Sequence, residues 1–270
     1  MNADITRRSI LAGIVALPVL PALVGCSPGT DIPAGVDLQD GTFSSRFWPG
    51  QKVRWRLASP GRRQRAVKVP PPLVVALHGH GGDADWAFDE VHIGRHIASS
   101  GLAVATVDGG DFYWHARRSG IDTGRMVIED LLSLMGSKGL ATDRIALIGW
   151  SMGGYGALLL ASRLGRRRVA GVAAVSAALW RSSGDSAAGA FDNHEDFTRN
   201  DVFAARSRLR GIPVRMDCGR QDPFIVANRA FARGLPSVAA TFDEGAHTQE
   251  YWAAHAGAQL SWLHGAFSKA

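Results

Sequence analysis

Short, largely apolar segments alternate with helix-like segments through most of this chain. The apolar segments, predicted as strands, span residues 73–77, 102–107, 144–148, 169–175, 213–218 and 238–242. The helix-like segments span residues 83–100, 124–137, 152–164, 224–234 and 248–264. Strands that are apolar on both faces are typical of a parallel sheet covered by helices on either side. The sequence therefore predicts an α/β fold.

A different pattern precedes the first of these strands. Residues 41–48 and 51–57 alternate polar and apolar side chains on either side of Pro49-Gly50. This arrangement predicts a β-hairpin with its turn at the Pro-Gly pair. We expect the hairpin and the parallel strands to form a mixed sheet of about eight strands in one domain over residues 40–270.

Residues 178–210 interrupt the alternation of strands and helices. The segment contains two glycines and a polar-aromatic stretch from Phe191 to Phe197. Long insertions in compact domains often serve as lids or binding loops. Two interpretations stay open: a short cap that acts as a lid, and an ordinary surface excursion.

The first 26 residues resemble an export signal. Arg7-Arg8 precede an apolar run over residues 10–24, as in a signal peptide, and paired arginines are typical of Tat-type signals. The segment from Leu23 to Cys26 resembles a bacterial lipobox, in which the cysteine thiol is joined to a lipid. We predict export, a lipid anchor at Cys26 on the outer side of the cell membrane (or secretion), and a flexible tether over residues 27–39. The alternative is a generic basic region with an incidental cysteine.

The chain is basic, with 30 lysines and arginines against 24 aspartates and glutamates and a formal charge of +6. Its arginines are scattered, whereas nucleic-acid modules concentrate them on one element with aromatic residues, so no nucleic-acid partner is expected. A basic surface instead favours an anionic membrane face. With Cys26 lipidated, Cys218 has no disulfide partner, and its apolar strand setting predicts a buried, inert thiol.

The residues Gly149-Trp150-Ser151-Met152-Gly153 have the form G-x-S-x-G. They follow a predicted buried strand and open a predicted helix, which is the setting of a nucleophile elbow that raises a serine hydroxyl above the sheet. Glycines are needed beside the serine because side chains would clash in so tight a turn. The helix N-terminus favours developing negative charge. Ser151 is therefore the predicted nucleophile.

A serine nucleophile needs a histidine to take its proton and an acid to orient that histidine. Asp222 and His247 each lie in a loop after a predicted strand, as Ser151 does. All three are therefore expected at the carboxyl edge of the sheet, where open α/β folds build their sites. Asp217 competes as the acid, although it falls inside a predicted strand.

The oxyanion of a tetrahedral intermediate needs preorganised N–H donors. One is predicted to be the backbone N–H of Met152, directly after the nucleophile. The other is expected from the loop His78-Gly79-His80-Gly81-Gly82, whose glycines allow close approach to a substrate. We assign the second donor to the N–H of His80, with Gly81 as the next candidate.

Taken together, the glycine-rich loop, the elbow, the Asp222-Pro223 turn and residues 245–252 resemble the "putative esterase" branch of the α/β-hydrolases. That branch includes esterase D-like enzymes and the mycolyltransferases of the cell wall, and the resemblance covers residues 73–263. It implies the α/β-hydrolase fold, an acyl-serine mechanism, and neither a metal nor an organic cofactor. The implied substrate is a small-molecule or lipid ester.

Several functions are compatible with such a site. A serine esterase acting on carboxylic or thio esters is expected, and an acyltransferase of envelope lipids or sugars is the alternative. A peptidase usually carries a large extra domain, and a non-catalytic envelope-binding lipoprotein has no need for three catalytic residue types at three strand ends. Trp114 and His115 follow the predicted strand 102–107 at the rim of the site, where they either contact substrate or pack the loop.

Overall fold

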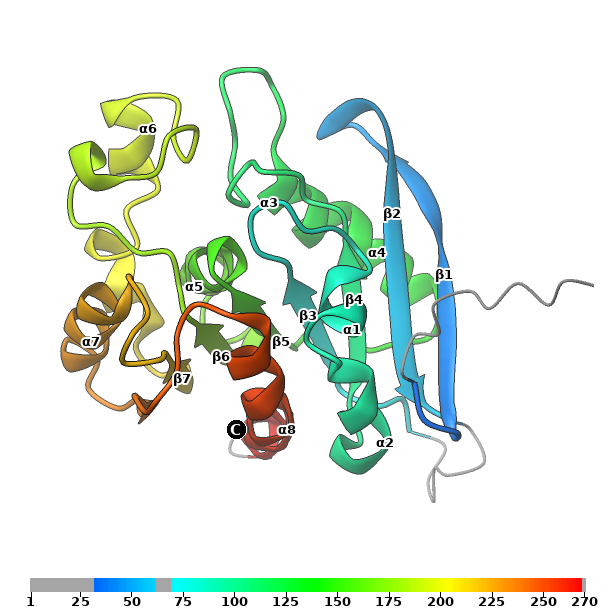
Figure 1. Cartoon of the computed structure of the whole chain (residues 1–270). Coiled ribbons are helices and arrows are strands. Elements are labelled where there is room, and N and C mark those ends of the chain that lie inside the picture. The colour runs from blue at the N-terminus through cyan, green and yellow to red at the C-terminus, as the bar shows by residue number, and fades with distance from the viewer. Residues whose placement is uncertain (1–31, 62–68, 269–270) are drawn as a thin grey trace, which may run out of the picture.

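The computed structural model describes residues 32–61 and 69–268, and these residues form an eight-stranded sheet flanked by helices (Figure 1). The strands are β1 (Val36–Ser45), β2 (Trp48–Pro60), β3 (Leu73–Leu77), β4 (Ala103–Val107), β5 (Ile145–Trp150), β6 (Val169–Val175), β7 (Val214–Asp217) and β8 (Ala239–Thr241). Their order across the sheet is β1-β2-β4-β3-β5-β6-β7-β8. β2 pairs antiparallel with β1 and β4, whereas the neighbouring strands from β4 to β8 are parallel. The predicted mixed sheet is confirmed.

The hairpin differs from its prediction in where its first strand begins and in where its turn lies. β1 begins at Val36, so residues 36–39 belong to the sheet and not to the predicted tether. The turn lies at Arg46-Phe47, whereas Pro49-Gly50 falls within β2, close to the point where the strand register shifts. Phe47 explains the position of the turn, because its side chain is buried in the core.

The helices lie on both faces of the sheet (Figure 1). They are α1 (Trp86–Asp89), α2 (Ile97–Ser100), α3 (Thr123–Arg125), α4 (Leu132–Ser137), α5 (Met152–Leu164), α6 (His194–Arg199), α7 (Ile225–Arg233) and α8 (Gln249–Phe267). Short 3₁₀ turns occur at η1 (Ile93–His96), η3 (Ser183–Asp185) and η4 (Ala204–Leu209), and a π-helical turn, η2 (Met126–Leu131), joins α3 to α4. None of the helices in the described part of the chain has the length and hydropathy needed to cross a membrane.

Alternate residues of the central strands enter two separate hydrophobic cores. In β3, Leu73, Val75 and Leu77 pack with α4 and α5, while Val74 and Ala76 pack with α1, α2 and α8 on the opposite face. This period of two is what a strand buried on both sides requires. The sheet is therefore a rigid platform, and the loops at its carboxyl edge are held from two sides.

The long helix expected over residues 83–100 is broken into three short turns. His92 has a φ of 54°, a left-handed conformation that no helix interior tolerates. Val91 and Ile93 on either side of the break are both buried, so the short turns cover the sheet as a continuous helix would. The apolar spacing was therefore correct as a burial signal and wrong as a sign of one continuous helix.

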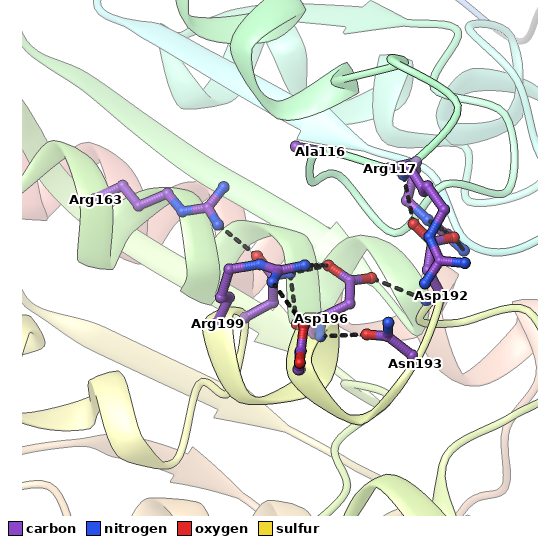
Figure 2. Close-up of a pocket in the computed structure, with 10 residues that line it drawn as sticks. Ala116, Arg117, Arg163, Asp192, Asn193, Asp196 and Arg199 are labelled. Carbon is purple, nitrogen blue, oxygen red and sulfur yellow. Dashed lines mark hydrogen bonds and ion pairs between the residues drawn. The ribbon is translucent and has the colours of Figure 1, made fainter.

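Hydrogen bonds tie the insertion at residues 178–210 to the loop after β4 and to α5. The guanidinium of Arg117 donates to the carboxylate of Asp192 over 2.9 and 3.1 Å, and Figure 2 shows these side chains facing each other. Deeper in, the hydroxyl of Tyr155 on α5 donates to the carbonyl of Asn200 over 2.8 Å. A polar cavity of about 530 Å³ lies between the insertion and the loop after β4. These contacts hold the insertion beside the carboxyl edge of the sheet.

Candidate active site

Ser151 lies in a sharp turn between β5 and α5. Its backbone has a φ of 53° and a ψ of −115°, a strained conformation for a residue with a side chain. The glycines on either side allow the turn: a Cβ at Gly149 would overlap the carbonyl of Gly153, and one at Gly153 would overlap the carbonyl of Leu77. The sequence thus forms the predicted elbow, with the serine raised at the end of the sheet.

His247 contacts Ser151 on one side and Asp222 on the other. Its Nε2 lies 2.9 Å from the Ser151 Oγ, and its Nδ1 lies 2.8 Å from the Asp222 Oδ2. A carboxylate only accepts hydrogen bonds, so Nδ1 carries the proton and Nε2 is free to accept the serine hydroxyl. Ser151, Asp222 and His247 come from the loops after β5, β7 and β8, and the structure brings their side chains together in one hydrogen-bonded series.

The Asp222 carboxylate is buried and well supplied with hydrogen bonds. Its Oδ1 accepts the backbone N–H of Phe224 over 2.8 Å, while Oδ2 accepts from His247. Burial alone would raise the pKa of Asp222, but the hydrogen bonds from His247, Phe224 and the Ser176 hydroxyl outweigh burial and lower it. The carboxylate is therefore ionised at neutral pH and can stabilise a protonated imidazole.

Asp217, the competing acid, is engaged elsewhere. It is fully buried at the end of β7, where its Oδ2 accepts from the Arg215 Nε and the Gln259 Nε2, each over 2.8 Å. These partners are not part of the Ser151–His247 arrangement. Asp217 thus ties β7 to α8, and Asp222 takes the position beside the histidine.

The glycine-rich loop after β3 is fixed by His78. The Nδ1–H of His78 donates to the Gly79 carbonyl over 2.7 Å, and its Nε2 accepts the Gly109 N–H over 2.9 Å. Burial lowers the pKa of His78, so the ring is neutral and this tautomer is retained. A Cβ at Gly79 would lie 3.5 Å from the Ser151 Cβ, which places the loop directly beside the nucleophile.

The backbone donors of this loop differ in their availability. The Gly81 N–H donates to Asp111 over 2.6 Å, and the Gly82 N–H donates to the Gly79 carbonyl over 3.1 Å. For the His80 N–H, no acceptor is found in the described part of the chain. Met152 is the first residue of α5, and such an N–H has no acceptor within its own helix. Within the described residues, the Gly81 N–H is therefore engaged, whereas the N–H groups of His80 and Met152 are not.

Trp114 and His115, expected at the rim of the site, are core residues. Both are fully buried. The Trp114 ring lies where side chains at Gly109 and Gly156 would otherwise stand, and His115 stacks on Phe191 with ring centroids 5.3 Å apart. The substrate-contact prediction is therefore wrong for this structure, and the loop-packing alternative describes both residues.

Three aromatic side chains form a row of ring contacts that begins at His247. None of them was among the predicted site residues. Phe224 lies 5.4 Å from His247 between ring centroids, Trp180 lies 5.7 Å from Phe224, and Tyr113 lies 5.7 Å from Trp180. Phe224 and Trp180 are half-buried, so part of each ring faces solvent. Only their position in the sequence could have indicated them, since each lies after the carboxyl end of a predicted strand.

The remaining predictions concern cysteines and the N-terminal segment. Cys218 is buried, and burial together with the charge of Asp222 raises the pKa of its thiol, so the thiol stays protonated. Within residues 32–61 and 69–268, no group of three or more His, Cys, Asp or Glu side chains is placed to hold a metal ion. Arg7-Arg8 and Cys26 lie outside the described residues.

The comparisons with known proteins agree with this architecture. A family model described as "Putative esterase" matches residues 50–262. Similar solved structures include a ferulic acid esterase (20% identity, 86% of this chain and 98% of that chain, TM-score 0.72) and an S-formylglutathione hydrolase from Agrobacterium tumefaciens (19%, 88% and 98%, 0.75). A third is MPT51 from Mycobacterium tuberculosis (17%, 84% and 97%, 0.67). A search of curated protein sequences finds no match. The predicted α/β-hydrolase fold is confirmed.

Proposed function

Because the chain belongs to the putative esterase family, we propose that it is a serine esterase that hydrolyses carboxylic or thio esters through an acyl-serine intermediate. The observation that carries this proposal is the hydrogen-bonded series Asp222–His247–Ser151 at the carboxyl edge of the sheet. A serine is a weak nucleophile until a neighbouring base takes its proton, and this series supplies the base and its orienting acid.

The first half of the reaction acylates the serine. The Ser151 Oγ attacks the ester carbonyl carbon while His247 Nε2 takes the hydroxyl proton, and the carbonyl oxygen gains the negative charge. The N–H groups of His80 and Met152 are the proposed donors to that oxygen, because neither has an acceptor among the described residues, Met152 directly follows the nucleophile, and His80 follows Gly79 beside it. The carbon–oxygen (or carbon–sulfur) bond then breaks, and the imidazolium gives its proton to the leaving group.

The second half releases the acid. A water molecule attacks the acyl carbonyl, His247 takes a proton from that water, and the Ser151 oxygen leaves and recovers the proton. The His247 side chain is 25% exposed, so solvent water has access to the position it must occupy. This exposure supports hydrolysis over transfer to a second alcohol, because a transferase must keep water away from its acyl-enzyme.

The aromatic residues beside the histidine support an ester with an apolar group. Phe224 and Trp180 present partly exposed rings, the first packed on His247 and the second on Phe224. Such rings offer a large apolar surface at little conformational cost. We propose that they bind the acyl or alcohol part of the substrate that lies next to the scissile bond.

Export and anchoring complete the proposal. Arg7-Arg8 with the apolar run after them support export, and Cys26 supports a lipid anchor on the outer side of the cell membrane. Metabolic labelling with a radioactive fatty acid tests the anchor: the full chain is expected to incorporate label and a Cys26→Ser variant is not. Equal labelling of both proteins would refute the anchor.

Hydrolysis of p-nitrophenyl esters from acetyl to palmitoyl tests the function. The wild-type protein is expected to release p-nitrophenol with a chain-length preference, and a Ser151→Ala variant is expected to lose at least about 10³-fold in kcat. Adding glycerol as an acceptor separates the alternatives, because a transferase would form glyceryl ester in preference to free acid. Equal turnover by the wild type and Ser151→Ala would contradict the proposal.

A further inference from the structure

Two neighbouring loops carry the acid and the histidine of the site. We call residues 219–222 the acid loop and residues 243–247 the histidine loop. Two backbone hydrogen bonds join them: Arg220 N–H to the Asp243 carbonyl (2.8 Å), and Gln221 N–H to the Gly245 carbonyl (2.9 Å). The loops are packed so closely at this point that a Cβ at Gly219 would overlap the Gly245 carbonyl.

The side chain of Gln221 adds a second set of bonds between the same loops. Its Oε1 accepts the Gly245 N–H over 2.9 Å, and its Nε2 donates to the Glu244 Oε2 over 2.7 Å. The other carboxylate oxygen, Glu244 Oε1, accepts from the Arg220 Nη1 over 3.0 Å. We call the side chains of Arg220, Gln221 and Glu244 the clasp. Hydrogen bonds from Gln221 and Arg220 lower the pKa of Glu244, so its carboxylate is ionised as this pattern requires.

The position of the clasp in the chain connects it to both catalytic partners. Gln221 directly precedes Asp222, and Gly245 lies two residues before His247. The amide of Gln221 therefore bonds the two loops within two residues of the side chains that make the 2.8 Å Asp222–His247 hydrogen bond. Catalytic groups must be held to within about 0.5 Å of their productive geometry, and such precision requires support from outside the reacting set.

The exposure of the clasp argues against a role in stability alone. The Arg220 and Glu244 side chains are 54% and 73% exposed, and Gln221 is exposed as well. Ion pairs and hydrogen bonds in such positions contribute little to the free energy of unfolding, because water competes for the same groups. What they can fix is the relative placement of two loops whose backbones are already in contact.

We propose that Gln221 is a positioning residue, which holds the acid loop and the histidine loop at the spacing that the Asp222–His247 hydrogen bond requires. The proposal rests on the proposed function, in which that hydrogen bond orients the catalytic base. In the described part of the chain, the Gln221 side chain bonds Gly245 and Glu244, and not Ser151 or His247. It acts through Gly245 and Glu244.

An exchange of the amide and the carboxylate tests the proposal. In Gln221→Glu, a second carboxylate faces Glu244 where the wild-type distance is 2.7 Å, so repulsion opens the clasp. The kcat is expected to fall about tenfold with KM unchanged, since only the placement of the base is altered. The double variant Gln221→Glu/Glu244→Gln keeps the net charge and restores the hydrogen bond between the two side chains with donor and acceptor exchanged. It is expected to recover kcat to within about twofold of the wild type, a non-additive result.

Two further readouts separate positioning from stability. The acid limb of the kcat/KM profile is expected to move to lower pH in Gln221→Glu, because the imidazolium loses part of its carboxylate partner, and to return in the double variant. The proton on His247 Nδ1 is expected as a downfield NMR signal that shifts upfield or broadens in Gln221→Glu and returns in the double variant. A loss of stability alone would reduce the fraction of active enzyme without shifting the acid limb of the pH profile or the Nδ1–H resonance.

Gln39→Glu is the matched control. It makes the same chemical change at an exposed glutamine of β1, at the opposite edge of the sheet, where the side chain contacts Lys138. Wild-type kcat is expected for this variant. The proposal is overturned if Gln221→Glu keeps the wild-type kcat, pH profile and Nδ1–H signal, or if the double variant is as impaired as Gln221→Glu. If the proposed function is wrong, the wild type shows no serine-dependent turnover. The Nδ1–H signal then still shows whether the clasp positions His247.

Discussion

Replacement of Asp222 by asparagine changes one atom in the buried site and leaves its shape intact. In the wild type, Oδ1 accepts the Phe224 N–H and Oδ2 accepts the His247 Nδ1–H, both over 2.8 Å. An asparagine has one acceptor and one donor in these positions. If its oxygen keeps the Phe224 N–H, its NH₂ faces His247, and Nδ1 must then become the acceptor. The proton moves to Nε2, where it points at Ser151 and prevents the ring from acting as a base.

The other orientation of the asparagine amide keeps the ring in its productive state but is costly for two reasons. Turning the amide so that its oxygen meets His247 leaves the NH₂ against the Phe224 N–H, and a buried unpaired donor costs about 1–3 kcal/mol. The neutral amide also stabilises the imidazolium less than a carboxylate does, by about 1.5–3 kcal/mol for a charged hydrogen bond. Together these amount to roughly 3–6 kcal/mol, or a fall in kcat of about 10²–10⁴.

The assay is steady-state hydrolysis of p-nitrophenyl acetate by the wild type and Asp222→Asn, with thermal unfolding to confirm folding. Asp217→Asn is the control, because Asp217 is equally buried but bonds to Arg215 and Gln259. The control is expected to lower the unfolding temperature and to keep kcat within a few-fold. A kcat for Asp222→Asn within about threefold of the wild type, or a larger loss of kcat in Asp217→Asn, would contradict this expectation.

Three further predictions concern the packing and ionisation of individual residues. Trp114→Ala is expected to lower the free energy of unfolding by about 3–5 kcal/mol in denaturant titrations, because it removes a large buried ring. A raised KM with an unchanged free energy of unfolding would instead show that Trp114 contacts the substrate. Gly153→Ala drives a Cβ into the Leu77 carbonyl and is expected to cost more than about 4 kcal/mol, so a soluble variant with wild-type unfolding temperature would contradict the account of the elbow. Burial lowers the pKa of His78, so below about pH 6.5 this histidine binds a proton in the unfolded chain but not in the folded chain. The free energy of unfolding is therefore expected to fall as the pH drops from about 6.5 to about 5. Thermal unfolding across that range measures the slope, and His78→Gln is expected to reduce it, while His96 and His115, whose pKa values burial also lowers, account for part of what remains.

The elements that the sequence predicted most closely are those whose apolar side chains can be accommodated only in the buried centre of the domain. β3, β6 and α5 match the predicted ranges 73–77, 169–175 and 152–164. Each strand is apolar throughout, so only a position buried on both faces suits it, and α5 begins where the glycines of the elbow require. The catalytic candidates followed from the same logic, since loops after parallel strands meet at one edge of the sheet.

The errors arose where position in the chain does not decide the direction of a side chain. Trp114 follows β4 at the correct edge, but with a φ of 58° it turns inward to cover the glycines of α5 and the neighbouring loop. His92 carries no breaking signal in a helical apolar pattern, yet it adopts a left-handed conformation. The clasp was also missed, because exposed Gln221 and Glu244 gain their meaning only when two distant loops are brought together.

Labelling by a fluorophosphonate probe tests whether Ser151 is a nucleophile activated by His247. The wild-type protein, a Ser151→Ala variant and a His247→Ala variant are treated with the probe, and the modified residue is located by peptide mass spectrometry. We predict rapid labelling of the wild type at Ser151 alone, none of Ser151→Ala, and labelling of His247→Ala slowed by at least about 10²-fold, the contribution typical of a general base. Labelling at another residue, or at Ser151 with equal speed in His247→Ala, would contradict the account.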